Sequence, residues 1–146
     1  WRDIAPFVVE WVTSDAERLA WDASVPHPNA VTRIVGLRIV VPDVAAAGTL
    51  YSRALGLAVA PLGAAAARVT LGEVAIDLIA RANASPMERD GGDGLAEIDL
   101  AVTDIGVAFA AIPGLTRDAD GVRYRIPAAS ALGASLALVE ISRPAS

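Results

Sequence analysis

An internal repeat constrains the fold of this chain more than any other feature of its sequence. Residues 34–57 read IVGLRIVVPDVAAAGTLYSRALGL, a pattern that alternates like a strand, turns at Asp43 and resumes with helical spacing until Gly56. Residues 95–112 repeat this order, with Asp104 at the turn. Because an aspartate at such a turn can cap the first helical turn, both copies predict a strand that leads directly into a helix.

Shorter alternating segments follow each copy. After a first helix at 44–55, strands are expected at 58–61, 67–71 and 74–80, and after a second helix ended by Pro113 and Gly114, strands are expected at 122–126 and 136–141. The sequence therefore predicts an α+β fold of tandem β-α-β-β-β units. The expected divisions are an N-terminal strand and loop at 1–32, a first unit at 33–82, a polar, glycine-rich linker at 83–94 and a second unit at 95–146.

The N-terminal segment resembles the end of a further unit. Residues 5–12 predict a buried strand that carries one acid, Glu10, and Ser14 with Glu17 has the spacing of a helix-capping pair. The chain opens on Trp1, without a methionine or a signal peptide. We therefore expect a processed or trimmed form, in which residues 1–32 are the remnant of a preceding unit.

Composition excludes several classes of function. The chain has no cysteine, so disulfides, thiolate zinc sites and cysteine nucleophiles are excluded, and its twelve basic residues are all arginine, which excludes a Schiff-base lysine. A net charge of −5 argues against a nucleic-acid partner. No apolar run approaches the roughly 20 residues of a membrane helix. We expect a cytoplasmic protein with no membrane partner and a bacterial type of composition.

The two opening strands carry complementary charges. Alternation places Arg38 on the polar face of the first strand, and Glu97 and Asp99 on the polar face of the second. If these faces meet, the three side chains form a charged cluster that either binds a polar substrate or is a structural ion pair. The cluster requires Arg38 and Glu97 to lie on the same side of the sheet.

Other candidate residues are isolated in the sequence. Asp77 and Glu140 are lone acids in apolar strands, where they are either inward carboxylates for a cation or for base catalysis, or outward acids paired with arginine. His27, the only histidine, lies between two prolines in an extended loop, where it either reaches a cleft or is simply exposed.

A charged strand is expected late in the chain. Arg123 and Arg125 flank Tyr124 and share a face, so they either receive an anionic ligand or protect an edge strand from aggregation.

The first repeat resembles the vicinal oxygen chelate superfamily, which includes glyoxalase I, bleomycin-resistance proteins and extradiol dioxygenases. The likeness lies in IVVPDVAAAGTLYSRALGL, with Tyr51 and the closing L-G-L at residues 55–57, and in PFVVEW followed by HPN, which resembles a glyoxalase-like branch. The resemblance implies that the two units form a curved mixed sheet around a cleft. Metal-binding members hold a divalent ion there with His, Gln or Glu from the first and last strands of each unit.

Carried onto this chain, the metal positions lack imidazole. The first-strand positions are Gly36 and Glu97, and the last-strand positions are Asp77 and either Ala137 or Glu140. The resemblance therefore implies either no cofactor or a weakly bound divalent metal, for which Asp77, Glu97 and Glu140 are the weak candidate ligands.

Two hypotheses of function follow. The first is a glyoxalase-like enzyme, a lyase or isomerase, that acts on a small polar molecule in the cleft without a His-ligated metal. The second is a metal-free protein that sequesters a small ligand as bleomycin-resistance proteins do, as a homodimer. The candidate catalytic residues are Glu97, Asp77 and His27, and the candidate substrate-binding residues are Arg38, Asp99, Arg125 and Tyr124.

Overall fold

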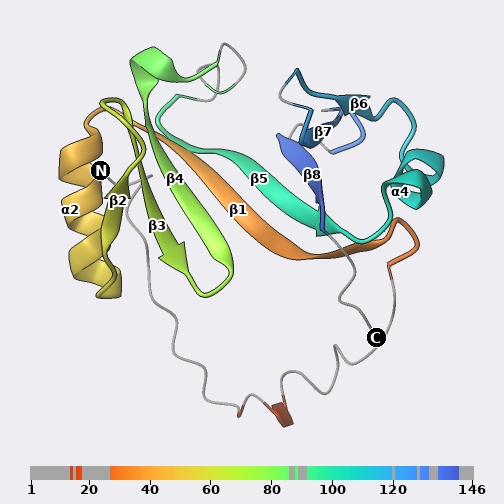
Figure 1. The fold of residues 1–146 in the computed structure, drawn as a ribbon, viewed down its shortest axis with the longest axis horizontal. Helices are drawn as coiled ribbons and strands as arrows, with labels where there is room; N and C mark the ends of the chain where they lie inside the picture. Colours follow the sequence, from red (N-terminus) through yellow and green to blue (C-terminus); the bar gives the residue numbers. More distant parts are fainter. Residues whose placement is uncertain are drawn as a thin grey trace.

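The structure is a computed structural model, and it describes residues 14, 16–17, 27–85, 88, 92–119, 121–127, 129–131 and 135–141. In this part of the chain, eight strands form one sheet and two α-helices pack on it (Figure 1). The first unit holds β1 (Val31–Val41), α2 (Val44–Leu55), β2 (Val59–Pro61), β3 (Ala66–Leu71) and β4 (Val74–Ala80). After the 3-10 turn Arg81–Asn83, the second unit holds β5 (Gly94–Val102), α4 (Ile105–Ala111), β6 (Thr116–Arg117), β7 (Arg123–Ile126) and β8 (Leu136–Glu140).

The sheet has a symmetric strand order, β2-β3-β4-β1-β5-β8-β7-β6. Within each half the opening strand pairs in parallel with the last strand, β1 with β4 and β5 with β8. The two halves join where β1 and β5 pair antiparallel, and the sheet curves around this junction (Figure 1). The predicted α+β fold with a curved mixed sheet is confirmed.

Both helices begin at the predicted aspartates. The Asp43 carboxylate accepts a hydrogen bond of 2.9 Å from the backbone N–H of Ala46, and the Asp104 carboxylate accepts one of 3.0 Å from that of Val107. Gly56 ends α2 in the left-handed conformation, with φ of 69°, which a residue without a side chain adopts at little cost. The turn chemistry of the repeat therefore fixes where each helix starts.

The helices cover one face of the sheet, and the other face carries charged side chains beside a small apolar cluster that includes Val40 and Ile79. Tyr51 of α2 packs with Ile39 and Leu78 in one apolar cluster, and Ala108 of α4 packs with Val102 and Leu138 in another. The registers of β1 with β4 and of β5 with β8 place these strand residues on the same face, toward the helices. Their neighbours in sequence therefore point to the opposite face.

The elements differ from the sequence prediction at a few boundaries. β1 begins at Val31, inside the segment that the sequence assigns to the N-terminal loop, and the two-residue strand β6 was not expected. The predicted strand at 5–12, with Glu10, lies outside the described residues. Ser14 and Glu17 form the expected capping pair, in which the Glu17 carboxylate accepts the Ser14 N–H at 3.0 Å.

Neither described helix is long and apolar enough to cross a membrane.

We expect Asp43→Ala to lower the free energy of unfolding by about 1 kcal/mol, because the cap of α2 loses its acceptor for the Ala46 N–H. Urea denaturation followed by circular dichroism measures this change. Glu73→Ala is the matched control, since the Glu73 side chain is 76% exposed and its ion pair with Arg33 lies on the surface. An equal loss in both variants would contradict a specific role for the cap.

Candidate functional site

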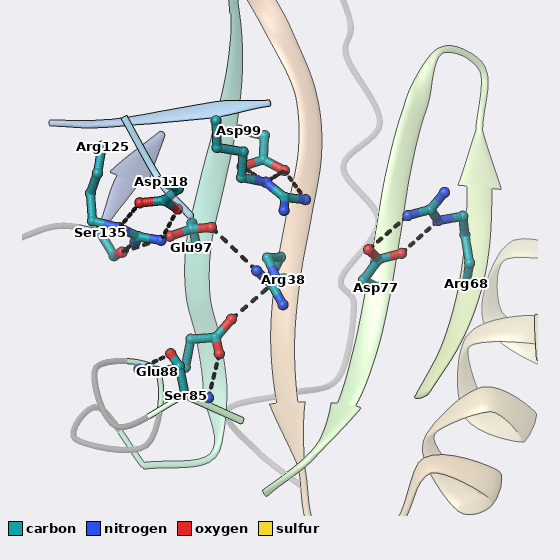
Figure 2. Close-up of polar contacts among 11 residues, drawn as sticks. Arg38, Arg68, Asp77, Ser85, Glu88, Glu97, Asp99, Asp118, Arg125 and Ser135 are labelled. Carbon is teal, nitrogen blue, oxygen red and sulfur yellow. Dashed lines mark hydrogen bonds and ion pairs between the residues drawn. The ribbon is translucent and has the colours of Figure 1, made fainter. Parts of the chain in front are cut away.

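The polar face of the sheet carries a row of charged side chains across the junction of the two halves. Arg38 on β1 lies opposite Asp77 on β4 and opposite Glu97 on β5. Figure 2 shows these side chains, together with Arg68 and Asp99, on the same side of the strands. Arg38 Nη1 lies 3.7 Å from Glu97 Oε1, so the geometric condition for the charged cluster is met.

Glu97 lies at the buried centre of this cluster. Its side chain is 0% exposed, it forms a close ion pair with Arg125, and it accepts a hydrogen bond of 3.2 Å from the Ser135 hydroxyl. Arg125 also donates to both oxygens of Asp118, at 3.2 and 2.7 Å. The hydrogen bonds that Arg125 donates to Asp118, together with the charge of Glu97, raise the pKa of Arg125 above its usual range. Glu97 is therefore enclosed by arginine and is poorly placed to act as a base.

A second buried glutamate reaches Arg38 from the linker. Glu88 Oε1 lies 3.1 Å from Arg38 Nε, and Glu88 Oε2 accepts the Ser85 backbone N–H at 2.7 Å. The Glu88 side chain is only 5% exposed. Arg38 therefore lies between Glu88 and Glu97 (Figure 2).

Asp99 is buried beside Arg123, with Nε of Arg123 at 3.3 Å from Asp99 Oδ1. Burial raises the pKa of Asp99, while the charge of Arg123 acts in the opposite direction and that of Glu97 adds to the rise. A Cβ atom at Gly36 would lie 2.7 Å from Asp99 Oδ2, a distance that no side chain tolerates without movement. Gly36 therefore gives Asp99 the room to lie over β1.

Asp77 has a partner on its own sheet half. Arg68 on β3 faces it and donates to both carboxylate oxygens, at 2.6 and 2.8 Å. This hydrogen bonding raises the pKa of Arg68, and the charge of Asp99 raises it further. Arg68 therefore interacts with carboxylates from both halves of the sheet, with Asp77 through hydrogen bonds and with Asp99 through charge.

Two cavities open on this polar face. One, of about 370 Å³, is lined by residues of both halves, among them Gly36, Arg68, Asp77, Asp99 and Arg123. The other, of about 550 Å³, is lined by Arg38, Leu62, Ala64, Ala65, Ala66, Asp77, Ile79 and Asn83. Asp77 borders both cavities, but only the smaller one is lined by residues of both halves, so the smaller cavity is the cleft at the junction of the repeats.

Three predicted site residues lie elsewhere. Tyr124 is on the helix face, where its ring meets Phe109 edge-on at 5.6 Å. Glu140 accepts a hydrogen bond of 3.4 Å from the Ile105 N–H at the start of α4. His27 is exposed just before β1, and seven residues of extended strand from Val31, about 23 Å, separate that end of β1 from Arg38.

Of the two alternatives, no cofactor or a weakly bound divalent metal, the metal has no suitable ligand set among the described residues. The strand register places Ala137 opposite Asp99, as Asp77 lies opposite Arg38, so Ala137 and not Glu140 is the last-strand position of the second unit. The four positions then hold one glycine, one alanine and two carboxylates that arginines already neutralise. Among the described residues, no group of three or more His, Cys, Asp and Glu side chains could hold a metal ion.

Sequence reasoning missed four residues of the site. Arg68 could have been found, because it alternates onto the polar face of a strand that pairs with Asp77. Glu88, Asp118 and Ser135 lie outside the strands, and only the tertiary fold brings them to Arg38, Arg125 and Glu97.

Comparison with known proteins identifies the fold. No family model matches the sequence, and no match is found among curated proteins. Among solved structures, methylmalonyl-CoA epimerase from Mycobacterium tuberculosis shares 18% identity with a TM-score of 0.58, covering 78% of this chain and 91% of its own.

Two further structures are similar. A Streptomyces coelicolor methylmalonyl-CoA epimerase variant in complex with 2-nitronate-propionyl-CoA shares 18% identity, has a TM-score of 0.59 and covers 80% of this chain and 99% of its own. A hypothetical protein from Bacillus halodurans shares 19% identity, has a TM-score of 0.58 and covers 78% and 97%. This chain therefore has the same fold as these epimerases.

We expect ¹³C NMR titration of the side-chain carboxyls to give Asp99 a pKa above the usual range for aspartate, and Arg123→Met to raise that pKa further. Since the folded state then holds the Asp99 proton more tightly than the unfolded chain, this group stabilises the fold at low pH. That contribution is lost as the pH rises through the raised pKa. Arg33→Met, which alters a surface arginine, is the control, and a fall in the pKa of Asp99 in Arg123→Met would contradict the assignment.

We also expect Gly36→Ala to destabilise the protein by about 1–3 kcal/mol, because the new methyl group overlaps the Asp99 carboxylate. Chemical denaturation measures the loss. In the double variant Gly36→Ala with Asp99→Ala the two changes should be less than additive, and strict additivity would show that they do not meet.

Proposed function

We propose that this protein binds a small anionic organic molecule, such as a carboxylate, in the polar cleft between its two repeats. The observation that carries the proposal is the cavity of about 370 Å³ to which Arg68 of the first half and Arg123 of the second both contribute. A cavity of this size accommodates a small organic molecule. Guanidinium groups bind carboxylates through paired, charge-assisted hydrogen bonds, which favours an anion over a neutral ligand.

Each cation of the cavity is opposed by one acid. Arg68 pairs with Asp77 and Arg123 pairs with Asp99, so the four groups are neutral when both acids are ionised. Arg68 is the more accessible of the two cations, with 41% of its side chain exposed. A ligand carboxylate can therefore contact Arg68 without breaking its pair with Asp77.

This binding does not require a metal. Glu97 and Asp77 are neutralised by Arg125, Arg38 and Arg68, and the site offers no imidazole among the described residues. A ligand-sequestering protein of the bleomycin-resistance type accords with these contacts, and the homodimer expected from that type stays a prediction.

A second candidate function is proton transfer to or from the bound molecule. Asp99 lines the cavity and is held at 3.3 Å from Arg123, so its carboxyl group is placed against any molecule that enters. The similar epimerases make an isomerase or lyase of this kind the natural enzymatic alternative. In this alternative Asp99 replaces Glu97 and Asp77 as the acid–base residue, because both of those carboxylates are more tightly paired.

We expect isothermal titration of a panel of acetate, malonate, succinate and inorganic phosphate to find a saturable ligand, and succinamide, the neutral counterpart of succinate, not to bind. Arg68→Gln should weaken binding at least tenfold, about 1.4 kcal/mol, because a charge-assisted contact is lost. Arg33→Gln is the control, since Arg33 pairs with Glu73 on the exposed surface. Equal weakening in the control, or no saturable anion, would contradict the proposal.

For the second candidate, the bound anion is incubated in D₂O and its carbon-bound hydrogens are followed by ¹H NMR. Catalysed exchange that Asp99→Asn abolishes while anion affinity persists would establish proton transfer. Binding without exchange would leave the sequestering function.

A further inference from the structure

Arg38 lies between two buried glutamates at the centre of the polar face. Its Nε is 3.1 Å from Glu88 Oε1 and its Nη1 is 3.7 Å from Glu97 Oε1. The side chains of Glu88 and Glu97 are 5% and 0% exposed, whereas that of Arg38 is 24% exposed and lines the larger cavity. Arg38 thus forms ion pairs with two carboxylates, those of Glu88 and Glu97, that are almost fully buried (Figure 2).

These contacts are electrostatic and not directional. Arg38 Nε, Glu88 Oε1 and Glu97 Oε1 are all buried without a hydrogen-bond partner within the described part of the chain, although the ion-pair distances are short. Arg38 therefore acts on these oxygens mainly as a positive charge. Glu97 also pairs with Arg125, and both buried carboxylates would be strongly unfavourable without a neighbouring cation.

Arg38 lies beside two of the four positions at which the resemblance implies metal ligands. The strand register sets it directly between Asp77 on one neighbouring strand and Glu97 on the other. A divalent ion placed between these acids would lie against the guanidinium group and be repelled by it. The site therefore already contains the positive charge that a metal would supply.

We propose that the Arg38 guanidinium is a built-in cation that takes the place of a divalent metal on this face of the sheet, with Glu88 and Glu97 as its counter-ions. Glu88 comes from the linker and not from a strand, so this carboxylate pair is not the ligand set expected from the resemblance. This role of Arg38 concerns the protein without a ligand, so it does not depend on the anion binding proposed above.

The test asks whether removing Arg38 creates a site for a metal ion. Arg38→Met keeps most of the side-chain length but removes the charge, Arg38→Lys keeps a charge, and Arg38→Met with Glu97→Gln removes one of the carboxylates. Each variant and the wild type are melted with and without 1 mM Mn²⁺, and Mn²⁺ binding is measured by titration calorimetry.

We expect Mn²⁺ to leave the melting temperatures of the wild type and of Arg38→Lys unchanged. It should raise that of Arg38→Met by about 5 °C. The double variant should bind Mn²⁺ at least tenfold more weakly than Arg38→Met. If Arg38→Met unfolds without metal, Mn²⁺ should restore its native circular dichroism.

Three results would overturn the inference. The first is a saturable Mn²⁺ response of the wild type that Glu97→Gln abolishes, because the site would then hold a metal despite Arg38. The second is an Arg38→Met variant that Mn²⁺ neither stabilises nor refolds. The third is an Arg38→Lys variant that fails to fold, because charge alone would then not describe the role of Arg38.

Discussion

The antiparallel pairing of β1 with β5 is the constraint on which the rest of this molecule depends. It joins the two repeats into one sheet and fixes Arg38 opposite Glu97. A shift of one of these strands by one residue would move its charged side chains to the helix side and its core residues to the opposite face. The apolar packing of α2 and α4 therefore holds the charged residues in place indirectly, by fixing which face each strand buries.

The charged face of the sheet carries several ion pairs, and some of their acids come from outside the strands. In each of these ion pairs an arginine contacts acids that are wholly or partly buried. The pairs are Arg68 with Asp77, Arg123 with Asp99, and Arg125 with Glu97 and Asp118. Buried pairs of this kind contribute little net stability, because desolvation opposes their attraction. Their consequence for function is positional: they hold the side chains around the two cavities before any ligand arrives.

Much of the fold could be predicted from the sequence, because local signals determine it. The bounds of α2 follow from its capping aspartate and terminal glycine, and β4 follows from a short apolar run. The polar face was predicted by alternation for Arg38, Glu97 and Asp99. Glu88 could not be predicted, since nothing in a polar linker indicates which residue folds back, and Tyr124 was misjudged because neighbours on a strand point to opposite faces.

Gly36 makes the two copies of the repeat unequal. Its counterpart in the second copy is Glu97, so at this position one copy has no side chain and the other has an acid. The Asp99 carboxylate lies over the space that a side chain at position 36 would fill. The two halves are therefore not interchangeable, because the first supplies the space at Gly36 and the second supplies the Asp99 carboxylate that lies over it. A chain built from two copies of either half alone would lose this complementarity.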